Sequence, residues 1–434
     1  MHNNFTQAAG LGTGPESLEP YRSQHYFDLE REKIFRRTWL IMGRIEDLPN
    51  AGDYIVKEVE ICNASILITR QAGGAVRAFH NICSHRGNQI VWDTKGSRKT
   101  MFRCPYHNWT YGNDGRLLAI RDEKQFFGVD KKKCGLDAVQ CDVWDGWIFI
   151  NLNPTNQVSL RDYLGSMGEF LSGIPYPNAQ RSIKIQAHLK CNWKFLIDAF
   201  SESYHIPVLH SKTIGPTFSG KSNPMSHLQN AEFFGPHHSI SLYGNPEYKP
   251  EEAALVEKLA YAGMVSENVL AANQSQDTVD LRSHRSVNPA KSSTWSMDIN
   301  EIFPNFHLDV AGGGFWTHEI WPIALNESRY EMRFFVPKPA TVREAFHQEH
   351  YIARLADVVL EDLANVERTH KGVAARVKSE MVLQEHEVLI RRMLRIHKEF
   401  EHSSTLEEAL KRCSWADSPC AADPASAPAM EGIA

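Results

Sequence analysis

The sequence predicts two unlike folding units, a small all-β module followed by a larger α+β domain. Between about residues 40 and 155, short apolar runs of strand length are separated by turn residues such as Gly73-Gly74 and Asn113-Asp114-Gly115. After Asn153-Pro154, segments with helical spacing alternate with strand-like runs, which indicates an antiparallel sheet covered by helices. The expected organisation is an N-terminal arm and helix at 1–39, the β module at 40–155, the α+β domain at 156–412 and a disordered tail at 413–434.

Each element follows from its local pattern. Residues 1–20 are polar and rich in Gly and Ser, which predicts a mobile arm, and the apolar spacing from Phe27 to Trp39 predicts a helix. Apolar runs in the β module predict strands at 53–59, 65–69, 75–79, 100–103, 116–120 and 147–151. Helical spacing in the second unit predicts helices at 159–173, 192–205, 250–272, 341–371 and 376–412. Strand-like runs there lie at 181–190, 233–243, 292–300, 306–310, 315–322 and 328–336.

The composition is that of an ordinary globular protein, and it argues against several classes of partner. The net charge of −5 disfavours nucleic acid and anionic membrane surfaces, and no apolar run is long enough to span a bilayer. The N-terminus lacks the basic start and apolar stretch of a secretory signal, so we expect a cytoplasmic protein. In that compartment the eight cysteines are expected to be thiols or metal ligands rather than disulfides.

Two loops of the β module each offer one thiolate and one imidazole. They read Cys83-Ser84-His85-Arg86-Gly87 and Cys104-Pro105-Tyr106-His107-Asn108-Trp109. Such a pair can hold a dinuclear iron cluster with both cysteines on one iron and both histidines on the other, which is Rieske ligation. A zinc site is the competing interpretation, but zinc fingers usually pair Cys with Cys and His with His, whereas the order here alternates.

A second group of candidate ligands lies in the α+β domain. On a helical wheel, Asp198, Glu202 and His205 fall opposite an apolar stripe, which alone would indicate only a solvated face. Pro207 ends this helix and His210 follows five residues after His205, so the two histidines can converge on one metal from either side of the break.

A carboxylate completes this group. Asp362 lies in the middle of an apolar helical stripe between Leu355 and Val366, while its neighbour Glu361 points well away from that stripe. An unpaired carboxylate on a core face is costly, so it needs a cation or a strong partner, and a buried salt bridge is the alternative to a metal. Together with His205 and His210 it forms the two-histidine, one-carboxylate set that O2-activating iron uses.

The segment from Cys83 to Leu117 resembles the Rieske motif of the Rieske non-haem iron ring-hydroxylating oxygenases, and the run from Asn192 to His210 resembles the motif of their catalytic domain. The resemblance departs at Asn108, where many members have Gly, and at Asp198-Ala199, where Glu-Asn is common. It implies a catalytic domain of the helix-grip (START-like) type and a role for Glu202 as the bridge for electrons from a neighbouring subunit. It also implies one [2Fe-2S] cluster on Cys83, His85, Cys104 and His107 and one mononuclear Fe(II) on His205, His210 and Asp362.

The function that the resemblance implies is that of a terminal oxygenase (alpha) subunit, an oxidoreductase that uses O2. The chain has no G-x-G-x-x-G after a strand and no P-loop, so NAD(P)H acts through a separate reductase, with or without a ferredoxin. The resemblance further implies a homotrimer, with a small beta subunit as an optional addition. We expect hydroxylation or dihydroxylation of an aromatic or other hydrophobic ring, as in aromatic hydrocarbon catabolism. The alternative, suggested by Glu202, is a monooxygenase or N-demethylase of a quaternary amine, which needs an aromatic cage around the cation.

Each remaining candidate has a structural interpretation as well as a functional one. Arg86 and Trp109 either shield the cluster or pack the loops, and Glu367 and Gly372 are expected to be structural. A non-catalytic electron carrier or zinc protein is disfavoured by the second metal site. Aromatic side chains that could line a pocket, but more often form core, are Phe233, Phe234, Phe303, Phe306, Phe315 and Trp316. The cysteines without ligand spacing are Cys62, Cys134, Cys141, Cys191, Cys413 and Cys420.

Overall fold

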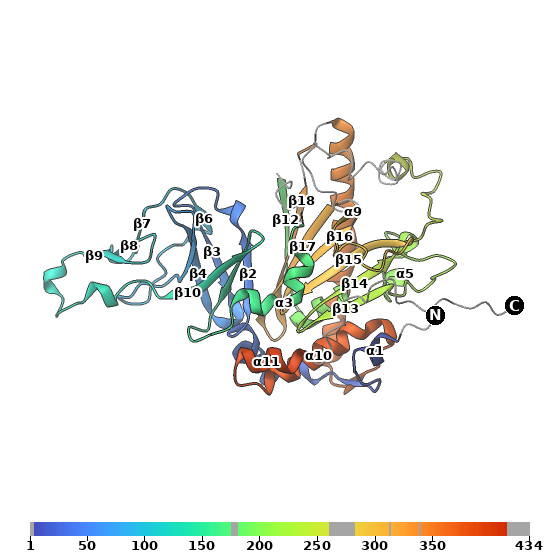
Figure 1. The fold of residues 1–434 in the computed structure, drawn as a ribbon, viewed down its shortest axis with the longest axis horizontal. Helices are drawn as coiled ribbons and strands as arrows, with labels where there is room; N and C mark the ends of the chain where they lie inside the picture. Colours follow the sequence, from blue (N-terminus) through green and yellow to red (C-terminus); the bar gives the residue numbers. More distant parts are fainter. Residues whose placement is uncertain are drawn as a thin grey trace.

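The computed structural model describes residues 4–174, 181–259, 283–311, 314–336, 338–339 and 341–414. Its elements form an all-β domain and, beside it, a larger domain in which helices cover an antiparallel sheet (Figure 1). The fold class predicted from the sequence is therefore confirmed. No helix in these residues is both long and apolar enough to cross a membrane.

The β domain contains a seven-stranded antiparallel sheet, in the order β2-β11-β10-β5-β4-β3-β6, and a three-stranded sheet β7-β8-β9. Gly115, with φ of +87°, lies in the turn between β8 and β9, where a Cβ would collide with Phe79, so the predicted hairpin signal has a steric basis. The strands are β2 (Trp39–Arg44), β3 (Tyr54–Val59), β4 (Ala64–Arg70), β5 (Val76–His80), β6 (Lys95–Gly96), β7 (Met101–Arg103), β8 (Thr110–Gly112), β9 (Leu117–Ala119), β10 (Ala138–Trp144) and β11 (Trp147–Asn151).

The larger domain is built on a second antiparallel sheet of seven strands, in the order β12-β18-β17-β16-β15-β14-β13. Its strands are β12 (Arg181–Leu189), β13 (Asn230–Phe234), β14 (His237–Tyr243), β15 (Trp295–Ile302), β16 (Phe306–Ala311), β17 (Gly314–Ala324) and β18 (Glu327–Val336). Its helices are α3 (Leu160–Leu171), α4 (Trp193–Phe200), α5 (Ile206–Leu209), α6 (Gly215–Phe218), α9 (Val342–Ala374), α10 (Val388–Glu401) and α11 (Leu406–Cys413).

One face of this sheet, which we call the site face, lies under α4 and α9. Side chains alternate along each strand, so directly paired residues on neighbouring strands share a face. Phe200 of α4 stacks on His318 with ring centroids 4.4 Å apart, and Tyr351 of α9 lies 6.0 Å from the ring of Trp316. By strand register, the site face carries His238, Glu301, His307, Asp309, Trp316, His318, Tyr330 and Met332.

The opposite face of the sheet holds the β domain. Trp147 of β11 packs its ring against Phe306 and Phe335, at centroid distances of 5.2 Å and 5.6 Å. Arg333 pairs with Asp47 through two hydrogen bonds of 2.6 Å and 2.8 Å. Apolar packing and a bidentate ion pair therefore fix the two domains to one another.

The N-terminal segment differs from the mobile arm expected from the sequence. Residues 16–17 form β1 (Glu16–Ser17), which pairs with β19 (Glu380–Met381), and α1 (Phe5–Ala8) precedes it. Ala9 and Tyr21 are buried, and Arg391 donates hydrogen bonds to the carbonyl groups of residues 13 and 14. These long-range contacts order a segment whose own composition is that of a loop.

Several predicted helices have different limits in the structure. The helix expected up to Trp39 is α2 (Gln24–Glu30) followed by a π-helical turn (Arg31–Phe35), and the one expected at 192–205 ends at Phe200. The helix expected at 376–412 is two helices, α10 and α11, preceded by β19 and a short 3-10 turn (Glu385–Glu387). Most of the helix expected at 250–272 lies outside the described residues, as do residues 415–434 of the expected tail.

Candidate active site and metal centres

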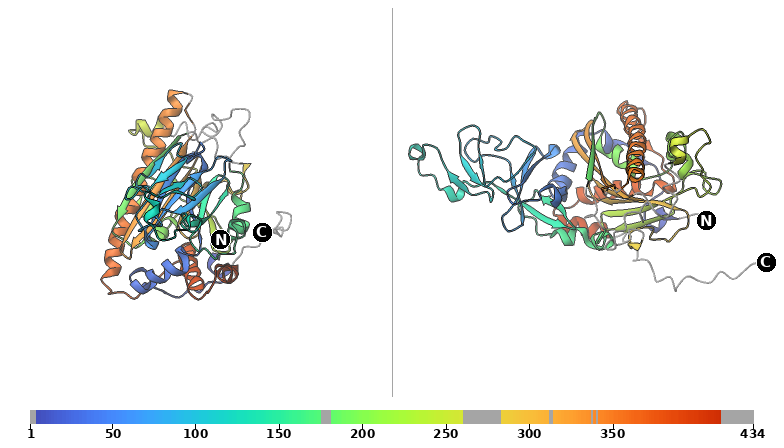
Figure 2. Two further views of the ribbon diagram at one scale, coloured as in Figure 1. Left: turned by 90° about the vertical axis from the view of Figure 1, so that its left-hand side faces the viewer. Right: turned by 90° about the horizontal axis from the view of Figure 1, so that it is seen from above.

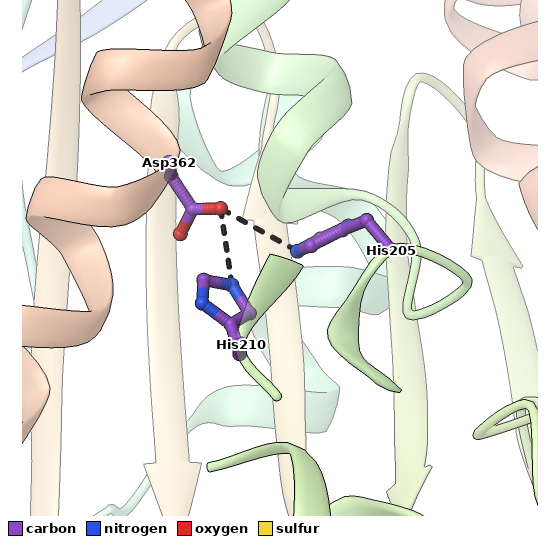
Figure 3. A group of neighbouring side chains, drawn as sticks. All are labelled: His205, His210 and Asp362. Carbon is purple, nitrogen blue, oxygen red and sulfur yellow. Dashed lines mark ion pairs between the residues drawn. The ribbon is translucent and has the colours of Figure 1, made fainter. Parts of the chain in front are cut away.

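Three predicted iron ligands converge between α5 and α9. His205 Nε2 lies 3.5 Å and His210 Nε2 lies 3.1 Å from Oδ1 of Asp362 (Figure 3). One ligand atom from each side chain lies within 4.8 Å of the other two. Among the His, Cys, Asp and Glu side chains of the described residues, no other three come together in this way. His210 and Asp362 are buried, whereas His205 is partly exposed. The donor set is that of a mononuclear iron site with open coordination positions.

The local sequence explains why the two histidines face one point. Asn192 caps α4 by accepting a hydrogen bond from the backbone N–H of Lys194, and the helix stops eight residues later. The carboxylate of Glu202 then accepts the backbone N–H groups of Tyr204 and His205, which holds the break. Pro207 occupies the first turn of α5, where its missing N–H costs nothing, and His210 ends that helix.

Each histidine is oriented by an acidic side chain at its other ring nitrogen. Glu202 Oε1 contacts Nδ1 of His205, and Glu361 Oε2 lies 2.6 Å from Nδ1 of His210. Thr213 donates its hydroxyl to the same Glu361 oxygen at 2.7 Å. The Nδ1–H groups therefore donate to carboxylates, which directs both Nε2 atoms toward Asp362.

Glu361 was not recognised as part of this site from the sequence. It does point away from the apolar stripe of α9, as expected, but the loop after His210 returns to meet it. Glu361 directly precedes Asp362 on α9. An acidic residue next to a candidate ligand carboxylate is the feature of the sequence that could have identified it.

The charges around the site raise the histidine pKa values. Burial lowers the pKa of His205, but Glu202 and Asp362 outweigh it and raise the pKa to about 8. Burial lowers the pKa of His210 as well, but Asp362 and Glu361 outweigh burial and raise this pKa above its ordinary value. The same surroundings that stabilise an imidazolium stabilise a divalent cation, so metal binding is expected to release protons. Burial raises the pKa of nearby Asp198 to about 8 despite Tyr21 and Lys194, so that acid is not a permanent charge of the site.

The four predicted cluster ligands lie in two neighbouring loops, with the two imidazole rings close to each other. Cys83 and Cys104 are buried, whereas His85 and His107 are partly exposed with ring centroids 4.6 Å apart. Two cysteines and two histidines are the donor set of a Rieske cluster. Tyr111 supports it, because its hydroxyl lies 3.2 Å from Sγ of Cys83.

The two cluster loops are closed by equivalent backbone hydrogen bonds. Gly87 N–H donates to the Cys83 carbonyl, and Asn108 N–H donates to the Cys104 carbonyl, each at 2.9 Å. Gly87 has φ of +76° and Asn108 has φ of +61°, so both stand in the left-handed region. Asn tolerates this conformation better than other side chains, which explains how it replaces the Gly of many members.

The side chains that flank the ligands have separable roles. Trp109 is buried and stacks on His85 at 5.1 Å, so it both packs the loop and covers one ligand ring. Arg86 lies over the ring of Tyr106 at 5.3 Å and donates to its hydroxyl, at the exposed rim of the loops. Both interpretations of Trp109 therefore hold, whereas the contacts of Arg86 are with the neighbouring loop.

The other described cysteines are free thiols. Burial raises the pKa values of Cys62, Cys141 and Cys191 to about 12, which makes these thiols poor nucleophiles. Cys420 lies outside the described residues.

The site face carries a row of buried polar side chains that the sequence analysis did not identify. Glu301 Oε2 lies 2.8 Å from His238 Nε2 and 3.4 Å from His307 Nε2. In the neighbouring row, Asp309 Oδ2 lies 3.0 Å from Nε2 of His318, whose Nδ1 contacts the hydroxyl of Tyr330. These groups come from five strands, so only the strand register places them together.

Most of the aromatic residues considered for a pocket are core instead. Phe306 and Phe315 lie on the opposite face, against Trp147 and Phe335, and Phe303 packs on Phe400. Trp316 is the member that meets a helix over the site face, through Tyr351.

The two centres lie on opposite sides of the catalytic sheet. The cluster loops belong to the outer part of the β domain around β7, β8 and β9, whereas α5 and α9 lie beyond the sheet (Figures 1 and 2). The backbone of the sheet therefore separates the cluster ligands from the iron ligands of the same chain.

Comparison with known proteins identifies both domains. The family described as "Ring hydroxylating alpha subunit (catalytic domain)" matches residues 177–400, and the Rieske [2Fe-2S] domain matches residues 38–139. Among solved structures, a quaternary ammonium Rieske monooxygenase is 18% identical with a TM-score of 0.68, covering 89% of this chain and 95% of that chain. Naphthalene 1,2-dioxygenase from Rhodococcus sp. bound to indole is 20% identical with a TM-score of 0.67, covering 93% and 95%. At such identities these likenesses show the fold alone.

Curated relatives match over part of their length. The carnitine monooxygenase oxygenase subunit of Escherichia coli is 32% identical over 192 residues, which are 44% of this chain and 50% of the relative. The glycine betaine monooxygenase oxygenase subunit of Pseudomonas aeruginosa is 32% identical over 194 residues, 45% of this chain and 44% of the relative. The chain thus matches about half the length of these relatives. Together with its Rieske domain, the match over more than half of the sequence shows that the chain belongs to the ring-hydroxylating oxygenase alpha subunits.

Proposed function

We propose that the chain is the terminal oxygenase component of a system in which a separate reductase, with or without a ferredoxin, supplies the electrons. The observation that carries the proposal is the convergence of His205, His210 and Asp362 in a chain that also presents the paired Cys-His loops. When bound, the [2Fe-2S] cluster supplies single electrons and the mononuclear iron supplies the position at which O2 is activated. In a monooxygenation, one oxygen atom enters a substrate C–H bond, and the other leaves as water after uptake of two electrons and two protons.

The residues of the chain position and insulate this chemistry. Glu202 and Glu361 hold the two imidazoles in the tautomer that leaves each Nε2 free for the metal. Asp362 is buried at the edge of the site face, so its charge is compensated by the metal and the two histidines rather than by water.

We further propose that Glu202 bridges the iron site to the cluster of a neighbouring copy, in a homotrimer, and so lies on the path of the electrons. Two facts support this proposal. The catalytic sheet separates the two centres within one chain, and Glu202, with 11% of its side chain exposed, contacts His205 from the side away from Asp362. A beta subunit is not required by this arrangement.

Two substrate classes follow from the observations. The sequence favours an aromatic or other hydrophobic ring, and the dioxygenase with bound indole shares the fold. The partial matches favour an amine, because the relatives include carnitine and glycine betaine monooxygenase subunits and an N,N-dimethyl phenylurea N-demethylase subunit of Sphingobium sp.. We propose oxygenation as the reaction and treat the substrate class separately below.

A single-turnover experiment tests the oxygenase proposal. The cluster would be reduced chemically without air, and the full chain would be mixed with aromatic acids, steroid acids and quaternary amines before labelled O2 is added. Label in a product, one atom or two, supports the proposal and separates mono- from dioxygenation. His210→Ala is the matched control, because it should keep the reduced cluster and form no labelled product. Equal product from this variant would contradict the assignment.

A further inference from the structure

One buried acid on the site face lacks the partners that a carboxylate requires. Asp309 is 2% exposed, and its Oδ1 has no hydrogen-bond partner in the described part of the chain. The other oxygen has one, Nε2 of His318 at 3.0 Å. That nitrogen also accepts the indole N–H of Trp316 at 3.0 Å, and an Nε2 that accepts this bond carries no proton to give to Asp309.

The position of Asp309 connects it to the iron site. Its partner His318 stacks on Phe200, the last residue of α4, and contacts the hydroxyl of Tyr330. The carboxylates of Asp309 and Asp362 both act on Tyr330, where burial is the larger cause of a raised phenol pKa. Asp309 therefore lies on the face of the sheet that the candidate iron ligands cover, and Tyr330 is near both Asp309 and Asp362.

Two aromatic side chains lie on the same side of the sheet as this carboxylate. Trp316 is paired directly with Asp309 on the neighbouring strand, and the ring of Tyr351 of α9 lies 6.0 Å from the ring of Trp316. Asp309 also acts on Tyr351, whose phenol pKa is raised by burial first and by this charge second. A buried carboxylate that has one oxygen without a partner and lies beside aromatic rings attracts an ammonium group, including one that cannot donate hydrogen bonds.

The charges on this side of the sheet also favour a bound cation. Asp309 forms no ion pair with Lys or Arg in the described residues, and neither do the other acids around the iron ligands. Those acids are Glu202, Glu301, Glu361 and Asp362. A neutral ring bound here would leave Oδ1 of Asp309 buried without a partner, whereas a cation would compensate its charge.

We infer that Asp309, with Trp316 and Tyr351 beside it, is a cation-recognition subsite, and that the substrate carries a quaternary or other fully alkylated ammonium group. The inference rests on the proposed oxygenase function and selects between its two substrate classes. Asp309 acts here as a specificity residue and takes no part in binding the iron.

Binding of a matched pair of probes tests the subsite. Choline and 3,3-dimethylbutan-1-ol have the same shape and differ in a positive nitrogen against a neutral carbon. Calorimetric titration into the full chain, loaded with cluster and iron, should show at least a tenfold preference for choline. In Asp309→Asn the affinity for choline should fall at least tenfold, and the affinity for the neutral alcohol should stay within about twofold.

A control on the other side of the same sheet excludes a general effect of removing a buried acid. Asp298 is equally buried, but it accepts hydrogen bonds from the Ser241 hydroxyl and the Asn288 backbone on the opposite face. Asp298→Asn should keep the preference for choline. No preference in the wild-type chain, or an undiminished preference in Asp309→Asn, would overturn the inference.

Failure of the cation subsite and failure of the oxygenase proposal can be told apart. Iron content and the visible spectrum of the cluster, measured on the same samples, report whether both centres are present. Labelled product from a neutral ring alone would overturn the cation subsite and leave the oxygenase function standing. Selective binding of choline without any labelled product would do the reverse.

Discussion

Glu361 should control how tightly the chain holds its mononuclear iron, although it is not a ligand. In Glu361→Gln the side chain keeps its size but loses its charge, and its amide must choose between the His210 Nδ1–H and the Thr213 hydroxyl. Loss of such a partner typically lowers metal affinity by 10- to 100-fold, or about 1.4–2.7 kcal/mol. Because 30% of the Glu361 side chain is exposed, water can replace part of the lost interaction, and we expect a loss near tenfold.

The measurement is anaerobic competition for Fe(II) against a chelator, with the cluster absorbance used to confirm that the β domain is intact. Asp357→Asn is the matched control, since Asp357 is an exposed acid one helical turn earlier on α9 and the change removes the same charge. Iron affinity in Glu361→Gln within about threefold of that of the control would refute the reasoning. A tenfold loss in both variants would do so as well, because it would assign the effect to net charge rather than to the contact with His210.

Three further outcomes follow from the same contacts. His210→Ala should lose the mononuclear iron and keep the brown colour of the cluster, which metal analysis and absorbance check together. Glu202→Gln should keep both centres yet lose most of its turnover, and near-normal turnover would refute the bridging role. Burial lowers the pKa of His237 from 6.5 to about 4, although the hydrogen bond that its Nε2 donates to the Tyr163 carbonyl acts in the opposite direction. The unfolded chain alone binds this proton between pH 6.5 and 4, so the free energy of unfolding should fall by about 3 kcal/mol over that range, and urea unfolding of His237→Gln should show a shallower slope.

The candidate metal ligands could be singled out from the sequence because the pattern that marks them is local. Each cluster loop contains a Cys and a His within four residues, and His205 and His210 flank one proline-marked break. Asp362 lies far away in the sequence, but an acid on an apolar helical stripe stands out by its burial cost. The resemblance to a family then related these separate signals to one another.

The polar row on the site face could not be predicted, and the reason is strand register. Glu301 lies between His238 and His307 only because β15 pairs with β14 and β16 in one particular alignment. A shift by one residue would move all of these side chains to the opposite face, and nothing in the spacing of isolated polar residues reveals the alignment. The early end of α4 has a related cause, because the Glu202 carboxylate accepts backbone N–H groups that a longer helix would have used.

The placement of the two candidate centres favours an assembly of chains for the proposed function. Moving the cluster to the iron of its own chain would break the Arg333–Asp47 pair and expose Trp147, which is 1% exposed between the domains. The rim of the cluster loops is, by contrast, apolar and open, with Trp92 71% and Tyr106 56% exposed. Exposed aromatic side chains around two partly exposed histidines form a surface that gains free energy when it is covered. We therefore expect a second copy of the chain to cover this rim and to bring its Glu202 toward His85 and His107, because this arrangement buries the apolar rim and shortens the electron path in one step.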